Sequence, residues 1–260
     1  MSESIRKKLP VNSPLPKIPF GGLTSNMLRT IAVILMLSDH IWATYGNLGN
    51  WMTYIGRMAF PIFAFQIAEG FVHTSNFKKY ALRLLLFAIG TEIPFNLFYS
   101  SRVFNPFHQN VLFTLLLGLL AIRVIDEARK ERTAKNIILG IIWLLLICLA
   151  SIIGFVDYGF LGMLMVVMFY VLRDFPFAWL AQLVAMVLIN IVFFEGQVFP
   201  IELLGRTFEI PSQGFAVFAL FPIWLYGGKK GKSSKIMQYG FYAFYPVHML
   251  ILYIILMNIN

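Results

Sequence analysis

Charged residues are scarce in this chain. Only 13% of its 260 residues are Asp, Glu, Lys or Arg, whereas an ordinary soluble domain has roughly 25%. No long polar block occurs anywhere, and 59% of the residues are hydrophobic. These absences exclude a soluble domain and predict an all-α, polytopic membrane protein.

Several chemistries lack the residues that they require. The single cysteine, Cys148, lies in an apolar run and cannot form a disulfide within the chain. The sequence contains no zinc signature, no phosphate-binding loop and no GxSxG elbow, so we expect no metal site. The first twenty residues are basic and proline-rich and lack the apolar core of a signal peptide. We expect a cytoplasmic arm over 1–23 and one transmembrane domain over 24–260.

Apolar stretches of about 20 residues are long enough to cross a bilayer. Nine are present, at 24–46, 51–72, 77–99, 107–126, 136–154, 157–173, 176–195, 212–228 and 235–257. Basic residues test this number, because cytoplasmic loops are enriched in Lys and Arg. With the N-terminus inside, every inner segment is basic, and the outer segments hold only Arg102 and Arg206. The inner residues are Arg6, Lys7, Lys8, Lys17, Lys78, Lys79, Arg83, Arg123, Arg129, Lys130, Arg132, Lys135, Arg173, Lys229, Lys230, Lys232 and Lys235.

We therefore predict nine transmembrane helices, with the N-terminus cytoplasmic and the C-terminus outside. The net charge of +9 is explained by this topology, so we expect membrane lipids and no nucleic acid as partners. The outer segment Glu195–Ser212 contains acidic residues and prolines, and we expect a lid or a re-entrant segment there.

The first apolar stretch carries unusual polar residues. Arg29 lies at its start, and the adjacent Asp39 and His40 lie well inside it. On an α-helix, Arg29 and His40 point in directions about 20° apart and lie about 16 Å apart along the axis. Arg29 and His40 therefore lie along one face of the helix, an arrangement that suits a ligand with a charged end and a reactive end.

Other intramembrane polar residues fall at a similar depth. The outer half of the predicted bundle contains Asp39, His40, Arg57, Glu92, Asn96, Asn110 and His248, whereas Glu69 lies near its inner end. Ionisable groups in hydrocarbon are expensive and generally functional, which favours a buried site. Each residue also has a structural interpretation, as half of an ion pair such as Asp39–Arg57, as a helix cap or as a contact between helices.

Four blocks in the first half of the chain resemble the TraX family of membrane proteins, which is named for an N-acetylase of conjugative pilin. They read MLSDHIW, IGRMAFPIFAFQIAEGF, RLLLFAIGTEIPFN and NVLFTLLLG. That family in turn resembles the wider superfamily of membrane acyltransferases. The superfamily pattern of an arginine, ten residues and a histidine matches Arg29 and His40, and its YPxH-like ending matches Tyr245 and His248. Glu69 stands where the superfamily usually has serine.

The resemblance implies a bacterial cytoplasmic (inner) membrane enzyme that uses acyl-CoA, usually acetyl-CoA. The acceptor would be a peptide, glycan or lipid at the outer face. Arg29, with Lys78, Lys79 and Arg83, would hold the CoA phosphates. His40 would be the general base, with Asp39 or Glu92 supporting its imidazolium. Arg57 or Asn110 would stabilise the oxyanion, and Glu69, Asn96, Asn110, Tyr245 and His248 would line the site.

Two mechanisms and two other functions stay open on the sequence. Transfer is either direct or proceeds through an acetyl-histidine. A proton-coupled transporter or flippase would use Asp39, Glu92 and His40 as a proton relay. A non-catalytic membrane scaffold is the third interpretation, and it explains the shared depth of the ionisable groups poorly.

Overall fold

A computed structural model describes residues 22–194, 196–203, 205–232 and 234–259. Most of the predicted N-terminal arm, 1–21, therefore lies outside the described residues. The elements are α1 (Ser25–Thr44), η2 (Gly46–Leu48), α2 (Trp51–Gly56), α3 (Ala59–His73), α4 (Phe77–Ser100), α5 (Val111–Lys130), α6 (Ala134–Ile153), α7 (Gly159–Val171), α8 (Ala178–Val187), η3 (Leu188–Phe193), β1 (Val198–Leu203), β2 (Arg206–Pro211), η4 (Ser212–Ala219), α9 (Leu220–Trp224) and α10 (Lys235–Ile259).

Each of the nine predicted segments contains helix. Helical stretches long and apolar enough to cross a membrane number five among the described residues, at Ser25–Thr44, Trp51–His73, Phe77–Ser100, Ala134–Ile153 and Tyr239–Asn258. Shorter apolar helices are Gly159–Val171, Ala178–Phe193 and Ser212–Trp224. The chain is thus a predominantly helical membrane protein, while nine crossings and the side of each terminus stay predictions.

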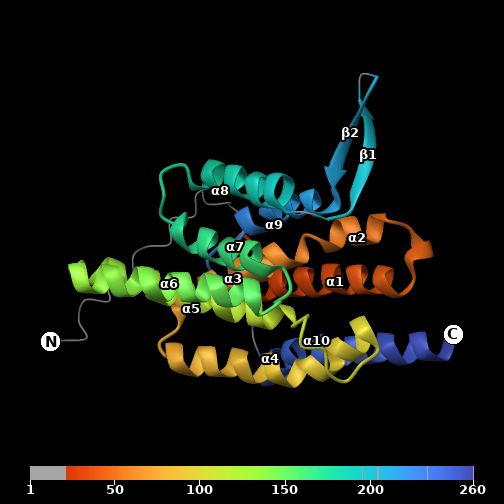
Figure 1. The fold of residues 1–260 in the computed structure, drawn as a ribbon, viewed down its shortest axis with the longest axis horizontal. Coiled ribbons are helices and arrows are strands. Elements are labelled where there is room, and N and C mark those ends of the chain that lie inside the picture. The colour runs from red at the N-terminus through yellow and green to blue at the C-terminus, as the bar shows by residue number, and fades with distance from the viewer. Residues whose placement is uncertain (1–21, 195, 204, 233, 260) are drawn as a thin grey trace.

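Helices α1, α3, α5 and α7 supply most of the central core (Figure 1). Leu28, Ile62, Leu119 and Val166 contribute side chains with no exposed surface. A Cβ on Gly118 would lie 2.6 Å from that of Val166, so the absence of a side chain lets α5 and α7 approach closely. Burial of these aliphatic groups in a close-packed interior holds the four helices together.

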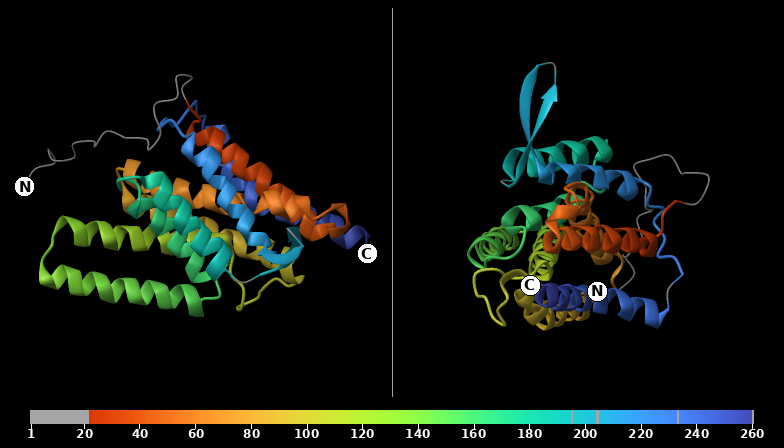
Figure 2. Two further views of the ribbon diagram at one scale, coloured as in Figure 1. Left: turned by 90° about the horizontal axis from the view of Figure 1, so that it is seen from above. Right: turned by 90° about the vertical axis from the view of Figure 1, so that its right-hand side faces the viewer.

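Further layers flank this core. Helices α4 and α10 pack against each other on one side, and α8, η4 and α9 lie on the opposite side (Figures 1 and 2). Phe95 and Phe98 of α4 meet Tyr245 and Met249 of α10 in a second apolar cluster. This contact brings the last helix beside α1, which sets up the site described below.

The segment 195–212 differs from the expectation of an all-helical chain. Strands β1 and β2 form an antiparallel hairpin that projects from the bundle (Figure 1). Pro200 and Pro211 disfavour a helix here and are tolerated in edge strands. The ring of Phe199 lies 4.9 Å from that of Tyr54, which ties the base of the hairpin to α2.

Backbone hydrogen bonds join residues at the ends of different helices and so define two ends of the bundle. The backbone N–H of Ser25, at the inner end of the predicted span 24–46, donates to the carbonyl of Lys229 in a predicted inner segment at 2.9 Å. The N–H of Gln109, at the outer end of the predicted span 107–126, donates at 2.9 Å to the carbonyl of Phe155, which lies in the predicted outer connection between 154 and 157. We call the end of the bundle that contains Ser25 and Lys229 the inner layer, and the end that contains Gln109 and Phe155 the outer layer.

Candidate active site

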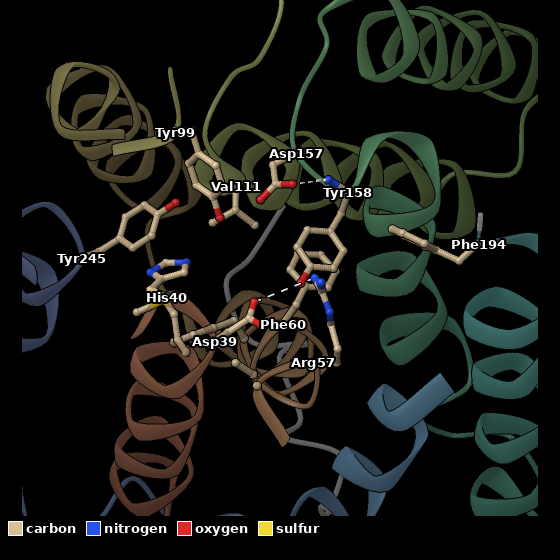
Figure 3. A pocket seen from close by; sticks show the side chains of 14 residues that line it. Asp39, His40, Arg57, Phe60, Tyr99, Val111, Asp157, Tyr158, Phe194 and Tyr245 are labelled. Carbon is tan, nitrogen blue, oxygen red and sulfur yellow. Dashed lines mark hydrogen bonds and ion pairs between the residues drawn. The ribbon is translucent and has the colours of Figure 1, made fainter. Parts of the chain in front are cut away.

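A cavity of about 150 Å³ opens in the outer layer, where α1, the end of α2, and the turn before α7 meet (Figure 3). Its wall includes Asp39, His40 and Arg57, which the sequence predicts to be catalytic, and Tyr245, predicted to line the site. An apolar cavity of roughly this size accepts a ligand as large as benzene. It therefore has room for an acetyl group and the reactive end of an acceptor, but not for a whole CoA.

Asp39 is held by residues of α2 and of the break that follows it. The hydroxyl of Thr53 donates to its Oδ1 at 2.6 Å, and the Nη1 of Arg57 lies 3.8 Å from its Oδ2. A Cβ on Gly56 would lie 2.4 Å from the Cβ of Asp39, so only glycine permits this approach. The carboxylate is thus directed at Arg57, and no hydrogen bond joins it to His40 among the described residues.

His40 is buried on the cavity wall between Asp39 and Tyr245 (Figure 3). Its Nδ1 lies 2.6 Å from the Nε2 of His248, and the two rings are nearly coplanar, with an interplanar angle of 5°. The Nδ1 of His248 lies in turn 2.6 Å from the carbonyl oxygen of Phe244. The structure therefore brings His248 to His40 although 208 residues separate them, and Nε2 of His40 makes no hydrogen bond among the described residues.

Arg57 lies in the break between α2 and α3. Its guanidinium reaches into the cavity beneath the ring of Tyr158 (Figure 3). Its Nε is buried and has no hydrogen-bond partner among the described residues. An unpaired buried donor of this kind is costly. The Arg57 side chain as a whole is 25% exposed and lines the cavity, so its guanidinium can donate to an oxygen atom there.

The opposite wall contains Asp157 and Tyr158, which the sequence analysis does not single out. They lie in a turn in which Phe155 and Tyr158 have φ of 49° and 62°, a conformation that costs energy for residues other than glycine. Thr114 donates to the carbonyl of Asp157, and Nε2 of His108 lies 3.8 Å from its Oδ1. The sequence feature that could have identified Asp157 is its carboxylate at the start of the apolar stretch 157–173.

Glu92, Asn96 and Asn110 form a separate network. Asn110 caps the N-terminus of α5, its Oδ1 accepting from the N–H of Leu112 at 3.0 Å. Glu92 Oε1 accepts from the backbone N–H of Asn110 at 2.8 Å and from its side-chain amide. Asn96 donates to Oε2 of Glu92 at 3.4 Å. These three predicted site residues therefore join α4 to α5, and none of them lies on the cavity wall.

The predicted CoA-binding residues lie at the inner layer. Arg29 donates from Nε to Gln66 at 3.3 Å and stacks over Phe241 at 5.3 Å. Arg83 stacks over Tyr242 at 5.5 Å, so both arginines meet the first half of α10. The two remaining residues of this set, Lys78 and Lys79, are exposed on the first turn of α4. The four residues flank the inner ends of α1, α4 and α10.

Glu69 does not belong to the cavity. Its Oε1 lies 3.4 Å from Nε of Arg173, and its Oε2 lies 3.6 Å from Nδ1 of His73. The pair with Arg173 is largely buried and ties the end of α3 to the second residue after α7. Within the described residues, no group of three or more His, Cys, Asp or Glu side chains is placed to hold a metal ion.

The chain matches the family model of the TraX protein over residues 24–256. It is 30% identical to a probable fimbrial assembly protein FimC, serogroup H1, of Dichelobacter nodosus, over 86% of this chain and 92% of that protein. It is also 26% identical to the protein TraX of Escherichia coli, over 56% of this chain and 54% of that protein. No solved structure matches it.

Proposed function

Because the chain belongs to the TraX family, we propose that it is a membrane-embedded acyltransferase. It moves an acyl group, in the simplest case acetyl, from acyl-CoA to a hydroxyl or amine of an acceptor. The observation that carries this proposal is the buried imidazole of His40 on the wall of a small cavity, beside an arginine with an unsatisfied donor. A base and an oxyanion-binding group within one water-poor cavity are the two elements that acyl transfer requires.

In the proposed reaction, the acceptor O–H or N–H attacks the thioester carbonyl carbon. The new C–O or C–N bond forms as Nε2 of His40 takes the acceptor proton. Arg57 donates to the oxyanion of the tetrahedral intermediate, and its ion pair with Asp39 keeps the guanidinium in place. The C–S bond then breaks, and His40 returns the proton to the sulfur of CoA. Asn110 is not needed for the oxyanion, since its amide is engaged with Glu92 and Ala88.

The donor would enter from the inner layer. Arg29 begins the same helix that carries His40, and eleven residues of α-helix measure about 16 Å. Arg29, Arg83 and the exposed lysines of α4 supply positive charge for the CoA phosphates. The pantetheine arm would follow α1 to the cavity, which has room only for the acyl end.

The acceptor would enter from the outer layer, where Asp157 and Tyr158 close the cavity. In this proposal the enzyme is a multi-pass protein of a bacterial cytoplasmic membrane, with the donor inside and the acceptor outside. A relative is named a fimbrial assembly protein, so a secreted peptide is the first acceptor class to test, before glycans and lipids.

The donor is tested by calorimetric titration of acetyl-CoA into the protein in nanodiscs. The wild type should bind saturably, and Arg29→Ala should weaken binding at least tenfold. Arg123→Ala is the matched control, because Arg123 also stacks over a phenylalanine at 5.3 Å, and is paired with Glu127 on its own helix. Equal weakening by both substitutions would indicate only a general loss of positive charge.

Turnover is tested by release of CoA thiol and by transfer of labelled acetyl to a peptide with a free N-terminus, an amino sugar or a hydroxylated glycan. His40→Ala should lower turnover about 10²–10⁴-fold, the usual contribution of a general base. Full transfer by folded His40→Ala would overturn the mechanism. A wild type that neither binds nor consumes any acyl-CoA, but moves an anionic solute unchanged across vesicles, would establish the transporter instead.

A further inference from the structure

We propose that His248 is a positioning residue that fixes the tautomer of His40. It holds the proton of His40 on Nδ1, so that the Nε2 lone pair faces the cavity. This inference rests on the proposed function for its catalytic consequence, but its structural content can be measured without turnover. It follows from a chain of two hydrogen bonds that connects α1 to the backbone of α10.

The series of hydrogen bonds begins at the backbone carbonyl of Phe244, which has only one possible role. The carbonyl oxygen of Phe244 can only accept a hydrogen bond. The Nδ1 of His248, 2.6 Å away, must therefore carry a proton and donate it. In a neutral imidazole one ring nitrogen is the donor and the other the acceptor. The Nε2 of neutral His248 is consequently an acceptor.

Because Nε2 of His248 accepts, the nitrogen of His40 that faces it must donate. The Nδ1 of His40 lies 2.6 Å from that acceptor, and the interplanar angle of 5° places the N–H and the lone pair in a common plane. The alternative tautomer of His40 would direct two lone pairs at each other across 2.6 Å with no proton between them. His40 is therefore protonated on Nδ1 and bare on Nε2.

This tautomer is the one that a base requires. Only a bare nitrogen can take a proton, and Nδ1 is turned away from the cavity toward α10. When Nε2 takes the acceptor proton, the new imidazolium keeps donating through Nδ1 to His248, which delocalises part of the charge. Asp39 does not perform this task, because its carboxylate is engaged with Thr53 and Arg57.

Packing supports the same role. The ring of His248 stacks with that of Phe244 at 4.6 Å, and His40 meets the rings of Phe98 and Tyr99 at 5.4 and 6.2 Å. Both imidazoles are buried, with 7% and 5% of their surface exposed. Rings enclosed in this way cannot turn freely to exchange their nitrogens, so the order of the hydrogen bonds is preserved.

The first measurement is the ¹⁵N spectrum of histidine-labelled protein in nanodiscs, with His40→Ala and His248→Gln used for assignment. The wild type should show a protonated Nδ1 and a bare Nε2 for His40. In His248→Leu, which offers no acceptor, the His40 proton should redistribute to Nε2. His248→Gln should keep Nδ1 protonated, because the glutamine side-chain oxygen can accept. A wild-type His40 with its proton on Nε2 would overturn the proposal.

Kinetics supply the second readout. His248→Leu should lower kcat about 10–100-fold with KM for acetyl-CoA unchanged, and His248→Gln should restore most of it. His73→Gln is the control, because His73 also bonds its Nδ1 to the carbonyl four residues earlier, at 2.9 Å, but lies at the inner layer. Unchanged kcat and an unchanged tautomer in His248→Leu would overturn the proposal. The wild-type tautomer without any acyl transfer would support the positioning and overturn the acyltransferase.

Discussion

Gly56 and Asp39 are in such close contact that a Cβ added to the glycine would lie 2.4 Å from the Cβ of the aspartate. The contact joins α2 to α1 one residue before Arg57, and therefore sets the relation of the Asp39–Arg57 pair to the cavity. A side chain at this position must displace either the backbone of α1 or the carboxylate. The cavity thus depends on a residue with no functional group.

Gly56→Ala should accordingly impair transfer more than it impairs folding. We expect turnover to fall about 10–100-fold, since a displacement of about 1 Å in a catalytic group has an effect of this order. Acetyl-CoA binding at the inner layer should be retained within about threefold. Gly90→Ala is the control, because Gly90 lies on α4 with no atom within 4 Å of an added Cβ. Equal turnover in the two variants would show that the Gly56 contact has no bearing on the site.

The sequence predicts a common depth for several site residues, but it does not predict how they are arranged around the bundle. Hydropathy and the distribution of basic residues place Asp39, His40, Arg57 and His248 in one layer, because both follow from the thickness of a bilayer. The direction in which each side chain points depends on helix packing. Glu92 is predicted to lie at the same depth, but its carboxylate accepts from the N–H of Asn110 at the start of α5 and is not directed at His40.

Local backbone conformation accounts for what the sequence analysis missed. Asp157 and Tyr158 reach the cavity through a turn that Gly154 and Gly159 indicate in the sequence, but the left-handed conformation of Phe155 and Tyr158 within it is not predictable from their residue types. The hairpin at 198–211 was missed for a related reason, since its strands are short and interrupted by proline. Propensity is a weak guide where tertiary contacts decide.

Glu92 provides a test that separates structural from catalytic roles. Glu92→Ala removes the acceptor of the Asn110 backbone N–H and side-chain amide, and an unsatisfied buried donor costs about 1–3 kcal/mol. We expect a clear fall in the free energy of unfolding, with kcat of the folded fraction within about threefold of wild type. Thermal unfolding in nanodiscs and active-site titration measure the two quantities. Unchanged stability with a hundredfold loss of kcat would instead assign Glu92 to catalysis.

Asp157 is expected to act on the acceptor side of the reaction. Its carboxylate faces the cavity from the wall opposite His40, and Oδ1 also accepts from the N–H of Tyr158 at 3.0 Å (Figure 3). Asp157→Asn preserves that acceptor and removes only the charge. We expect kcat/KM for the acceptor to fall about tenfold with the affinity for acetyl-CoA unchanged. Asp174→Asn, an exposed aspartate beyond the end of α7, serves as the control.

Glu69 and Arg173 are expected to stabilise the protein rather than to take part in transfer. Their side chains are only 12% and 18% exposed, and Nε of Arg173 lies 3.4 Å from Oε1 of Glu69. Removing one partner of a buried pair leaves the other charge unpaired, which costs about 3–5 kcal/mol. Arg173→Leu should therefore lower the free energy of unfolding markedly, and the double substitution Glu69→Leu, Arg173→Leu should recover a large part of that loss.

A double-mutant cycle on this pair, compared with one on Arg123 and Glu127, measures the effect. Those two residues form an ion pair on α5 with side chains 38% and 57% exposed, and such pairs contribute about 0.2–1 kcal/mol. The Glu69–Arg173 coupling should exceed the Arg123–Glu127 coupling by about 1 kcal/mol or more. Equal couplings would show that the inner pair is solvated in the membrane-embedded protein. If the Glu69 substitution lowered kcat without lowering stability, Glu69 would be a residue of the active site, as the sequence predicts.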